Sequence, residues 1–106
     1  MQDDAARDHG DQPLDTLMER WGITNHELVG TSEEQLSHKQ VQKARKGRQL
    51  TLHMMQKVTR TLNDVIFLKL AKDQQETFVP YQHKQLFSYA KNHESAAADP
   101  NESLLP

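Results

Sequence analysis

The feature that most constrains the fold of this chain is a regular series of signals that start and stop short helices. Pro13 suits the first position of a helix, where no backbone N–H donor is needed, and Gly22 suits the left-handed residue that often follows a helix. Thr24 comes next, with Glu27 three residues later, which is the spacing of a capping box. Apolar residues recur at helical spacing between the first two of these signals. The pattern predicts a helix over about 13–21 and a second helix that starts at Thr24.

A second set of signals marks the next helix. Ser37 and Gln40 have capping-box spacing, and Gly47 suits the end of the helix that they start. Only Val41 and Ala44, three residues apart, can form an inward face, because the other side chains of this segment are polar or basic. The predicted helix therefore buries a narrow stripe and presents most of its surface to a partner outside the domain.

The second half of the chain contains further helix signals. Thr51 is expected to cap a fourth helix, and the pair Asn63-Asp64 is expected to end it. The apolar start of residues 65–76 is compatible with a strand, but a helix is favoured for this range because helix-forming residues follow. Pro80 is expected to open a last helix. The inward face of the fourth helix is expected to consist of Leu52, Met55, Val58 and Leu62.

These signals predict an all-α fold, a compact bundle of four or five helices with an additional C-terminal helix. Residues 1–12 and residues 92–106 carry no apolar stripe at helical spacing, and the first of these segments is acidic. Both are expected to be disordered tails, because they cannot bury enough apolar surface to offset the entropy lost on ordering. The structured part of the chain is expected to span about 13–91.

Charge is distributed unevenly along the chain. Residues 1–34 contain nine acidic and two basic residues, a net charge of −7, whereas residues 35–63 contain seven basic residues and no acidic one, a net charge of +7. Residues 64–106 contain six acidic and four basic residues, which brings the whole chain to −2. The whole-chain value therefore hides a basic stretch, and such local asymmetry indicates a charged partner more directly than the average does.

Several classes of function and site are excluded by what the chain lacks. It has no cysteine for a disulfide, a nucleophile or a thiolate metal site, and its six histidines include no pair at i, i+4 spacing, so no metal or other cofactor is expected. It has no glycine-rich phosphate loop and no nucleophile motif, so it is not expected to be an enzyme or to bind a small-molecule effector. It also has no apolar run of about 18 residues and no secretory signal, so a cytoplasmic protein without a membrane partner is expected.

The basic helix over about 37–46 has the properties that reading DNA requires. An α-helix fits the major groove, which is about 12 Å wide, and a helix in that position can be buried in its own domain along only one narrow side. Basic residues that flank it meet the phosphates, which supply much of the affinity through counterion release. The absence of carboxylates from residues 35–63 removes repulsion from the DNA backbone. The sequence thus predicts binding to double-stranded DNA, with this helix in the major groove.

The order of these residues resembles the Cro/repressor-type helix-turn-helix family. Residues 23–29 (ITNHELV), residues 36–47 (LSHKQVQKARKG) and the capped helix after them carry the resemblance, which covers about residues 14–66. The resemblance implies a lambda-repressor-like DNA-binding domain over 13–66, followed by a C-terminal helical extension over 67–91. It also implies regulation of transcription, often as a homodimer on palindromic sites, so double-stranded DNA and a second copy of the chain are the expected partners.

The resemblance assigns roles to nine residues. Side chains on or beside the exposed face of the third helix fall where the family reads bases; they are His38, Lys39, Gln40, Gln42 and Lys43. Residues at the start of the second helix, at the end of the third helix and just after it fall where the family contacts phosphates; they are Asn25, Arg45, Lys46 and Arg48. Lysine pairs with guanine O6 and N7, and glutamine pairs with adenine N6 and N7, so this set suits direct readout of bases.

Three departures distinguish this chain from the family pattern. Val29 stands where the family usually has alanine, the connector from Val29 to Leu36 is about two residues longer than usual, and Arg45 replaces a usual glutamate. These departures leave open the angle between the predicted second and third helices. Two rival functions also stay open: a protein-interaction module that keeps the helix-turn-helix shape without binding DNA, and an RNA-binding protein, although the basic stretch has few aromatic residues to stack on single-stranded bases.

Overall fold

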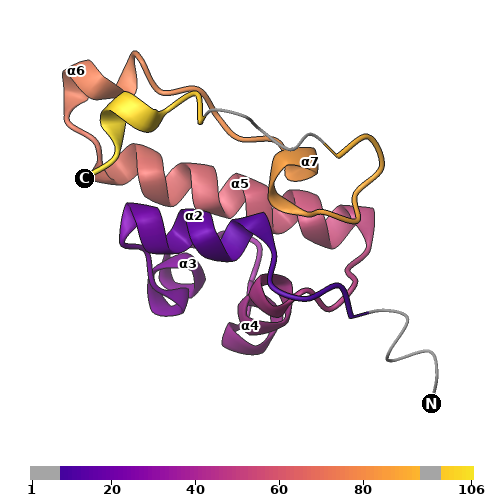
Figure 1. Cartoon of the computed structure of the whole chain (residues 1–106). Helices are drawn as coiled ribbons and strands as arrows, with labels where there is room; N and C mark the ends of the chain where they lie inside the picture. Colours follow the sequence, from indigo (N-terminus) through magenta and orange to yellow (C-terminus); the bar gives the residue numbers. More distant parts are fainter. Residues whose placement is uncertain (1–7, 94–98) are drawn as a thin grey trace.

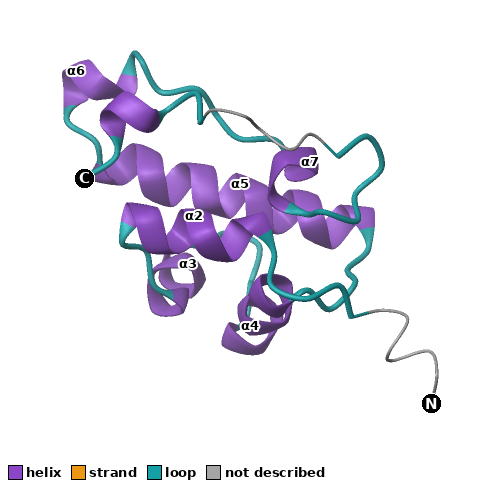
Figure 2. Cartoon of the chain, viewed as in Figure 1, coloured by secondary structure: helices purple, strands orange, loops and turns teal. Residues whose placement is uncertain are grey.

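The segments with helical spacing form helices in the computed structural model, which describes residues 8–93 and 99–106 (Figure 1). The α-helices of this part of the chain are α2 (Pro13–Trp21), α3 (Asn25–Thr31), α4 (His38–Lys46), α5 (Leu52–Lys69), α6 (Lys72–Gln75) and α7 (His83–Leu86). A 3-10 turn, η1 (Glu102–Leu104), follows near the C-terminus. The described residues contain no strand, only an isolated bridge between Asp8 and Arg48 (Figure 2). The expected all-α class is confirmed.

The predicted capping boxes at the start of α3 and α4 are both present. The Thr24 hydroxyl accepts a hydrogen bond from the Glu27 backbone N–H at 3.2 Å, and the Glu27 carboxylate accepts one from the Thr24 N–H at 2.9 Å. Ser37 and Gln40 make the same reciprocal pair at 3.1 and 2.9 Å. Because these bonds satisfy backbone donors that have no partner within the helix, both helices begin where the sequence predicts.

The core lies where α5 packs with α3, α4 and α7 and where α2 packs with α4 and α7 (Figure 1). Its fully buried apolar side chains come from five helices and from the residue after α7; they are Leu14, Met18, Leu28, Val41, Ala44, Val58, Leu62, Ile66, Leu86 and Phe87. Leu52 was expected on the inward face but is 54% exposed, because it is the first residue of α5 and the buried face begins one turn later at Met55. A buried α4 face limited to Val41 and Ala44 is confirmed.

The helix predicted to stop at Asn63-Asp64 continues through that pair to Lys69. The Asn63 side chain is engaged elsewhere, since it donates to the Tyr81 carbonyl at 3.0 Å and accepts from the Tyr81 N–H at 2.9 Å. The expected separate helix over 65–76 is therefore wrong, as is the strand alternative. Leu70 is extended and nearly buried, and it divides the end of α5 from the four-residue α6.

The C-terminal part of the chain covers the core. The last helix does not open at Pro80 but begins at His83 and has four residues. The expectation of a disordered tail over 92–106 is wrong for residues 99–106, because Asn101 is fully buried and pairs with the backbone of Val79. Its Oδ1 accepts from the Val79 N–H and its Nδ2 donates to the Val79 carbonyl, both at 2.8 Å.

Residues 8–12 also differ from the expected acidic tail over 1–12. The Gln12 side chain is 1% exposed, and its Oε1 accepts from the backbone N–H of Ser88 at 2.7 Å. Local apolar spacing cannot predict a hydrogen bond to a residue 76 positions away, so the sequence contains no sign that this segment is ordered. The remaining parts of the two predicted tails, residues 1–7 and 94–98, lie outside the described residues.

Candidate nucleic-acid interface

The exposed surface of α4 is basic and free of carboxylates. Lys39, Lys43 and Lys46 are exposed and stand at i, i+4 and i+7, so they lie along one side of the helix. The buried pair Val41 and Ala44 occupies the opposite side. The domain core thus holds α4 by a narrow stripe and directs a row of three cations away from itself.

Two further polar side chains lie beside this row. His38, at the first position of α4, and Gln42, one residue before Lys43, are both exposed. Gln40 differs, because its Oε1 accepts a hydrogen bond from the Ser37 backbone N–H at 2.9 Å. The structure therefore brings four of the five predicted base-reading residues together on one open face and gives the fifth, Gln40, a part in starting the helix.

Arg45, a predicted phosphate ligand, has partners inside the domain. Its Nε donates to Asp15 Oδ1 at 2.6 Å and its Nη1 donates to Asn25 Oδ1 at 2.8 Å. The Arg45 and Asp15 side chains are only 19% and 27% exposed. The three residues come from α2, α3 and α4, so this hydrogen-bond network links the three helices.

The helical spacing of Arg45 explains why its side chain lies beside the core and away from the three lysines. Arg45 stands four residues after Val41 and next to Ala44, so it flanks the buried stripe instead of sharing the side of the three lysines. Its acidic partner Asp15 was missed, because it lies 30 residues earlier and no spacing rule connects the two. Asn25 shares its carboxamide oxygen with this network and keeps its amide nitrogen as a donor.

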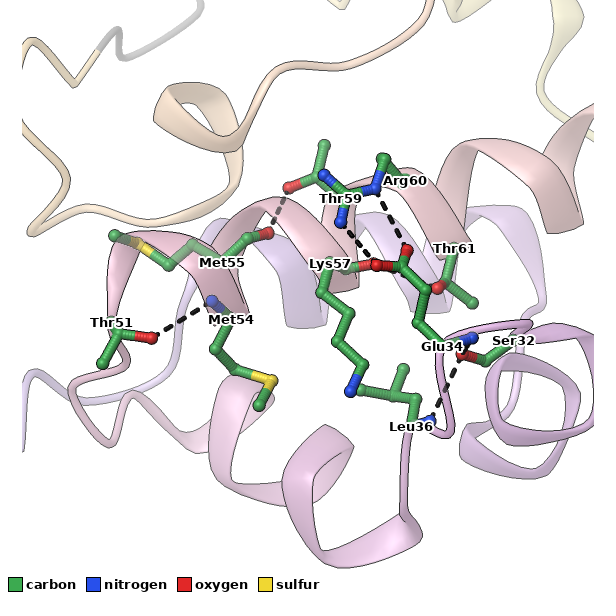
Figure 3. Close-up of polar contacts among 10 residues, drawn as sticks. All are labelled: Ser32, Glu34, Leu36, Thr51, Met54, Met55, Lys57, Thr59, Arg60 and Thr61. Atoms are coloured by element: carbon green, nitrogen blue, oxygen red, sulfur yellow. Dashed lines mark hydrogen bonds and ion pairs between the residues drawn. The ribbon is translucent and has the colours of Figure 1, made fainter.

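The long connector between α3 and α4 is closed by local hydrogen bonds (Figure 3). The Ser32 hydroxyl accepts from the backbone N–H groups of Glu34 and Leu36, at 3.1 and 3.3 Å. Gln35, which precedes the buried Leu36, adopts the left-handed conformation, with φ of 58°. The extra residues are absorbed in a defined turn, so α4 still packs against α3 and α5.

Glu34 fastens the same connector to α5 (Figure 3). Arg60 donates to both carboxylate oxygens of Glu34, from Nε at 3.0 Å and from Nη2 at 2.6 Å. This bidentate bond lowers the pKa of Glu34 and raises the pKa of Arg60. Arg60, one of the basic residues of the stretch 35–63, therefore binds the connector between α3 and α4 to α5.

The loop after α4 is fixed by the C-terminal part of the chain. Gly47 ends α4 in the left-handed conformation, with φ of 93°, and the Arg48 N–H returns to the Lys43 carbonyl at 3.1 Å. The Leu50 N–H donates to the Tyr89 hydroxyl at 2.9 Å. Burial raises the pKa of Tyr89, so its hydroxyl remains a neutral partner for the loop well into the alkaline range. The half-buried Arg48 and the exposed Lys46 flank this glycine.

His26 is a surface residue beside the candidate interface that the sequence did not single out. It lies exposed on α3, and its ring stacks on that of His38 with centroids 5.8 Å apart and an interplanar angle of 28°. The two residues are twelve positions apart in different helices, so only the packing of α3 against α4 brings them together. A second imidazole, from α3, therefore lies beside the start of α4.

The residues that the structure describes form neither a metal site nor a membrane-spanning helix. Within residues 8–93 and 99–106, no three side chains of the metal-binding types are grouped to hold an ion. None of the helices described has both the length and the apolar character needed to cross a membrane.

Comparison with models of protein families, with curated proteins and with solved structures finds no match to this chain.

Proposed function

We propose that this protein binds double-stranded DNA as a helix-turn-helix domain of the Cro/repressor type and regulates transcription. The observation that carries the proposal is the exposed row of Lys39, Lys43 and Lys46, on a helix that has no carboxylate and is held by a two-residue stripe. A helix presented in this way fits the major groove, and its cations meet the phosphates or the acceptor edges of guanine.

The residues divide into three roles in this proposal. His38, Lys39, Gln42 and Lys43 face the base edges. Lys46, Arg48 and the Asn25 amide nitrogen contact the DNA backbone and set the register. Arg45 acts as a positioning residue, since its bonds to α2 and α3 hold the helix that enters the groove.

A binding experiment with lysine variants tests the proposal. Affinity for duplex DNA is measured over a salt series for the parent, for Lys39→Ala/Lys43→Ala, and for Lys72→Ala as a control on an exposed residue of α6. The parent is expected to bind with steep salt dependence, and the double variant to lose about tenfold or more per lysine, because base and phosphate contacts of this kind contribute about 1–3 kcal/mol each. The control is expected to bind like the parent.

Two outcomes contradict the proposal. Absence of duplex binding by the parent even at about 50 mM salt would favour the protein-interaction module, and preference for duplex RNA over DNA would favour the RNA-binding function. Selection of bound sites from random duplex DNA then identifies the recognised sequence. A two-fold symmetric consensus is the result expected for a homodimer.

A further inference from the structure

Residues 8–12 run along the end of α4 and the loop that follows it (Figure 1). The His9 backbone N–H donates to the Gly47 carbonyl at 2.8 Å, and the Gln12 N–H donates to the Arg45 carbonyl at 3.1 Å. Carbonyl groups at the end of a helix have no partner within the helix, so this segment satisfies acceptors that α4 itself leaves open. The contact is part of the fold and joins the N-terminal segment to the candidate interface.

Side chains hold this segment from two further directions. The His9 ring stacks on Tyr89, with centroids 4.4 Å apart and an interplanar angle of 20°, and its Nε2 lies 3.1 Å from Gln49 Oε1. The buried Gln12 accepts at Oε1 from the backbone N–H of Ser88 at 2.7 Å. The segment is thus bound to the loop after α4 on one side and to the C-terminal part of the chain on the other.

This arrangement places two acidic residues in the segment that lies along the phosphate-contacting end of the proposed site. Asp8 and Asp11 are both exposed, and their immediate neighbours bond to Gly47 and Arg45. The same end of α4 carries Lys46, which the proposed function assigns to the DNA backbone. A carboxylate within a Debye length of a phosphate, about 10 Å at 0.1 M salt, repels it.

We propose that Asp8 and Asp11 make the docked N-terminal segment an inhibitory element of the DNA-binding site. The negative charge of the segment reduces the positive electrostatic potential that attracts phosphate to the end of α4. It thereby lowers the affinity of the domain for duplex DNA. This inference rests on the proposed function. It adds a negative regulator within the same chain, whose effect is strongest at low ionic strength because salt screens the repulsion.

The charge of the segment can be removed without removing its contacts. Asp8 Oδ1 accepts from the Gly10 N–H at 3.1 Å, and the carboxamide oxygen of an asparagine accepts the same bond. The other contacts of the segment to the end of α4 and to the loop after it come from its backbone and from the His9 ring. The double variant Asp8→Asn/Asp11→Asn therefore separates the electrostatic effect from the positioning of the loop.

The test compares this variant with a matched control in the full chain. Asp73→Asn/Glu76→Gln also removes two exposed carboxylates, but from α6 and the residue after it, which Figure 1 shows far from α4 along the molecule. Affinity for a random-sequence duplex is measured by fluorescence anisotropy between about 50 and 300 mM salt. Asp8→Asn/Asp11→Asn is expected to bind about two- to fivefold more tightly than the parent at the lowest salt, with convergence at the highest, whereas the control changes little.

The outcomes separate this inference from the proposed function. If the parent binds duplex DNA and depends on Lys39 and Lys43, but Asp8→Asn/Asp11→Asn gains no more affinity than the control, the inhibitory role is wrong and the proposed function stands. If the parent binds no duplex at about 50 mM salt, both are wrong. Circular dichroism of each variant checks that the helices are retained, so that a change in affinity reports charge.

Discussion

At the scale of single residues, Arg45 is the side chain whose surroundings most affect the proposed interface. Its guanidinium lies between a carboxylate of α2 and a carboxamide of α3, and both bonds are shorter than 3 Å. Because the group is partly removed from water, loss of its anionic partner leaves a charge with reduced solvation. The network therefore contributes to stability as well as to the orientation of α4.

Removal of the carboxylate from this network gives a measurable prediction. Asp15→Ala is expected to lower the free energy of unfolding by about 1–3 kcal/mol, the range for a partly buried charged hydrogen bond. Glu19→Ala, at an exposed position of the same helix, serves as the control and is expected to change it by less than about 0.5 kcal/mol. Urea denaturation measures both. Equal effects of the two variants would show that the network does not stabilise the domain.

The bidentate pair of Glu34 and Arg60 predicts a pH dependence. The folded state lowers the pKa of Glu34 from its ordinary value of 4.5, first through the bond from Arg60. A lowered carboxyl pKa contributes stability that is fully present above the unfolded value and is lost as the pH falls through the folded value. The difference in stability between the parent and Glu34→Gln is thus expected to be largest near neutral pH and to shrink below about 4.5.

Urea denaturation of both proteins from pH 7 down to about pH 3 measures this difference. Glu33→Gln, at the exposed neighbouring position, is the control for the general effect of one less acidic residue in the connector. A difference between parent and Glu34→Gln that stays constant over this range would contradict the assignment of the pH effect to the ion pair.

At the scale of elements, the end of α4 depends on a glycine for two separate reasons. Gly47 has a φ of 93°, which side chains rarely adopt, and a Cβ at this position would overlap the backbone of Gly10. Gly30, within α3, has no such conformation and no atom within 4 Å of an added Cβ. The two glycines therefore respond in opposite ways to the same substitution.

Gly47→Ala is expected to lower the free energy of unfolding by at least about 1–3 kcal/mol, whereas Gly30→Ala is expected to raise it by about 0.5–1 kcal/mol. Thermal or urea denaturation of the two variants beside the parent gives the sign of each change. A Gly47→Ala protein as stable as the parent would show that the N-terminal segment does not pack on the end of α4 as described.

At the scale of the whole molecule, the C-terminal part of the chain acts as a cover joined to α2 and α5. The Tyr81 hydroxyl accepts from Trp21 Nε1 at 3.2 Å and donates to the Asp99 carboxylate at 2.7 Å, and burial raises the pKa of Tyr81 to about 12. Asn101 adds its pair of bonds to Val79. Residues 99–106 are therefore expected to unfold together with the helices.

The prediction at this scale concerns Asn101. Asn101→Ala removes both partners of the Val79 backbone and is expected to lower the free energy of unfolding by about 1–3 kcal/mol, since the fully buried Asn101 side chain makes both of these part-buried hydrogen bonds. Ser103→Ala, an exposed neighbour, is expected to have little effect. A single transition in urea, followed by Trp21 fluorescence and by circular dichroism, would report cooperative unfolding; no change in stability for Asn101→Ala would contradict it.

The sequence by itself determined the starts of α2, α3, α4 and α5, the glycine stops after α2 and α4, and the basic exposed face of α4. Caps, left-handed glycines and apolar spacing act within one or two turns, so they can be recognised without knowledge of the remaining chain. The exposed cluster of His38, Lys39, Gln42 and Lys43 follows from the same local periodicity.

Only the tertiary structure decided which local alternative was adopted elsewhere. The partner of Arg45, the continuation of α5 through Asn63, and the docking of Gln12 and Asn101 all depend on hydrogen bonds between residues at least 18 positions apart. For such residues the local options, a cap, a helix interior or a solvated tail, differ little in free energy. A distant partner that satisfies a buried polar group then decides between them, because leaving that group without a partner costs more than the local preference contributes.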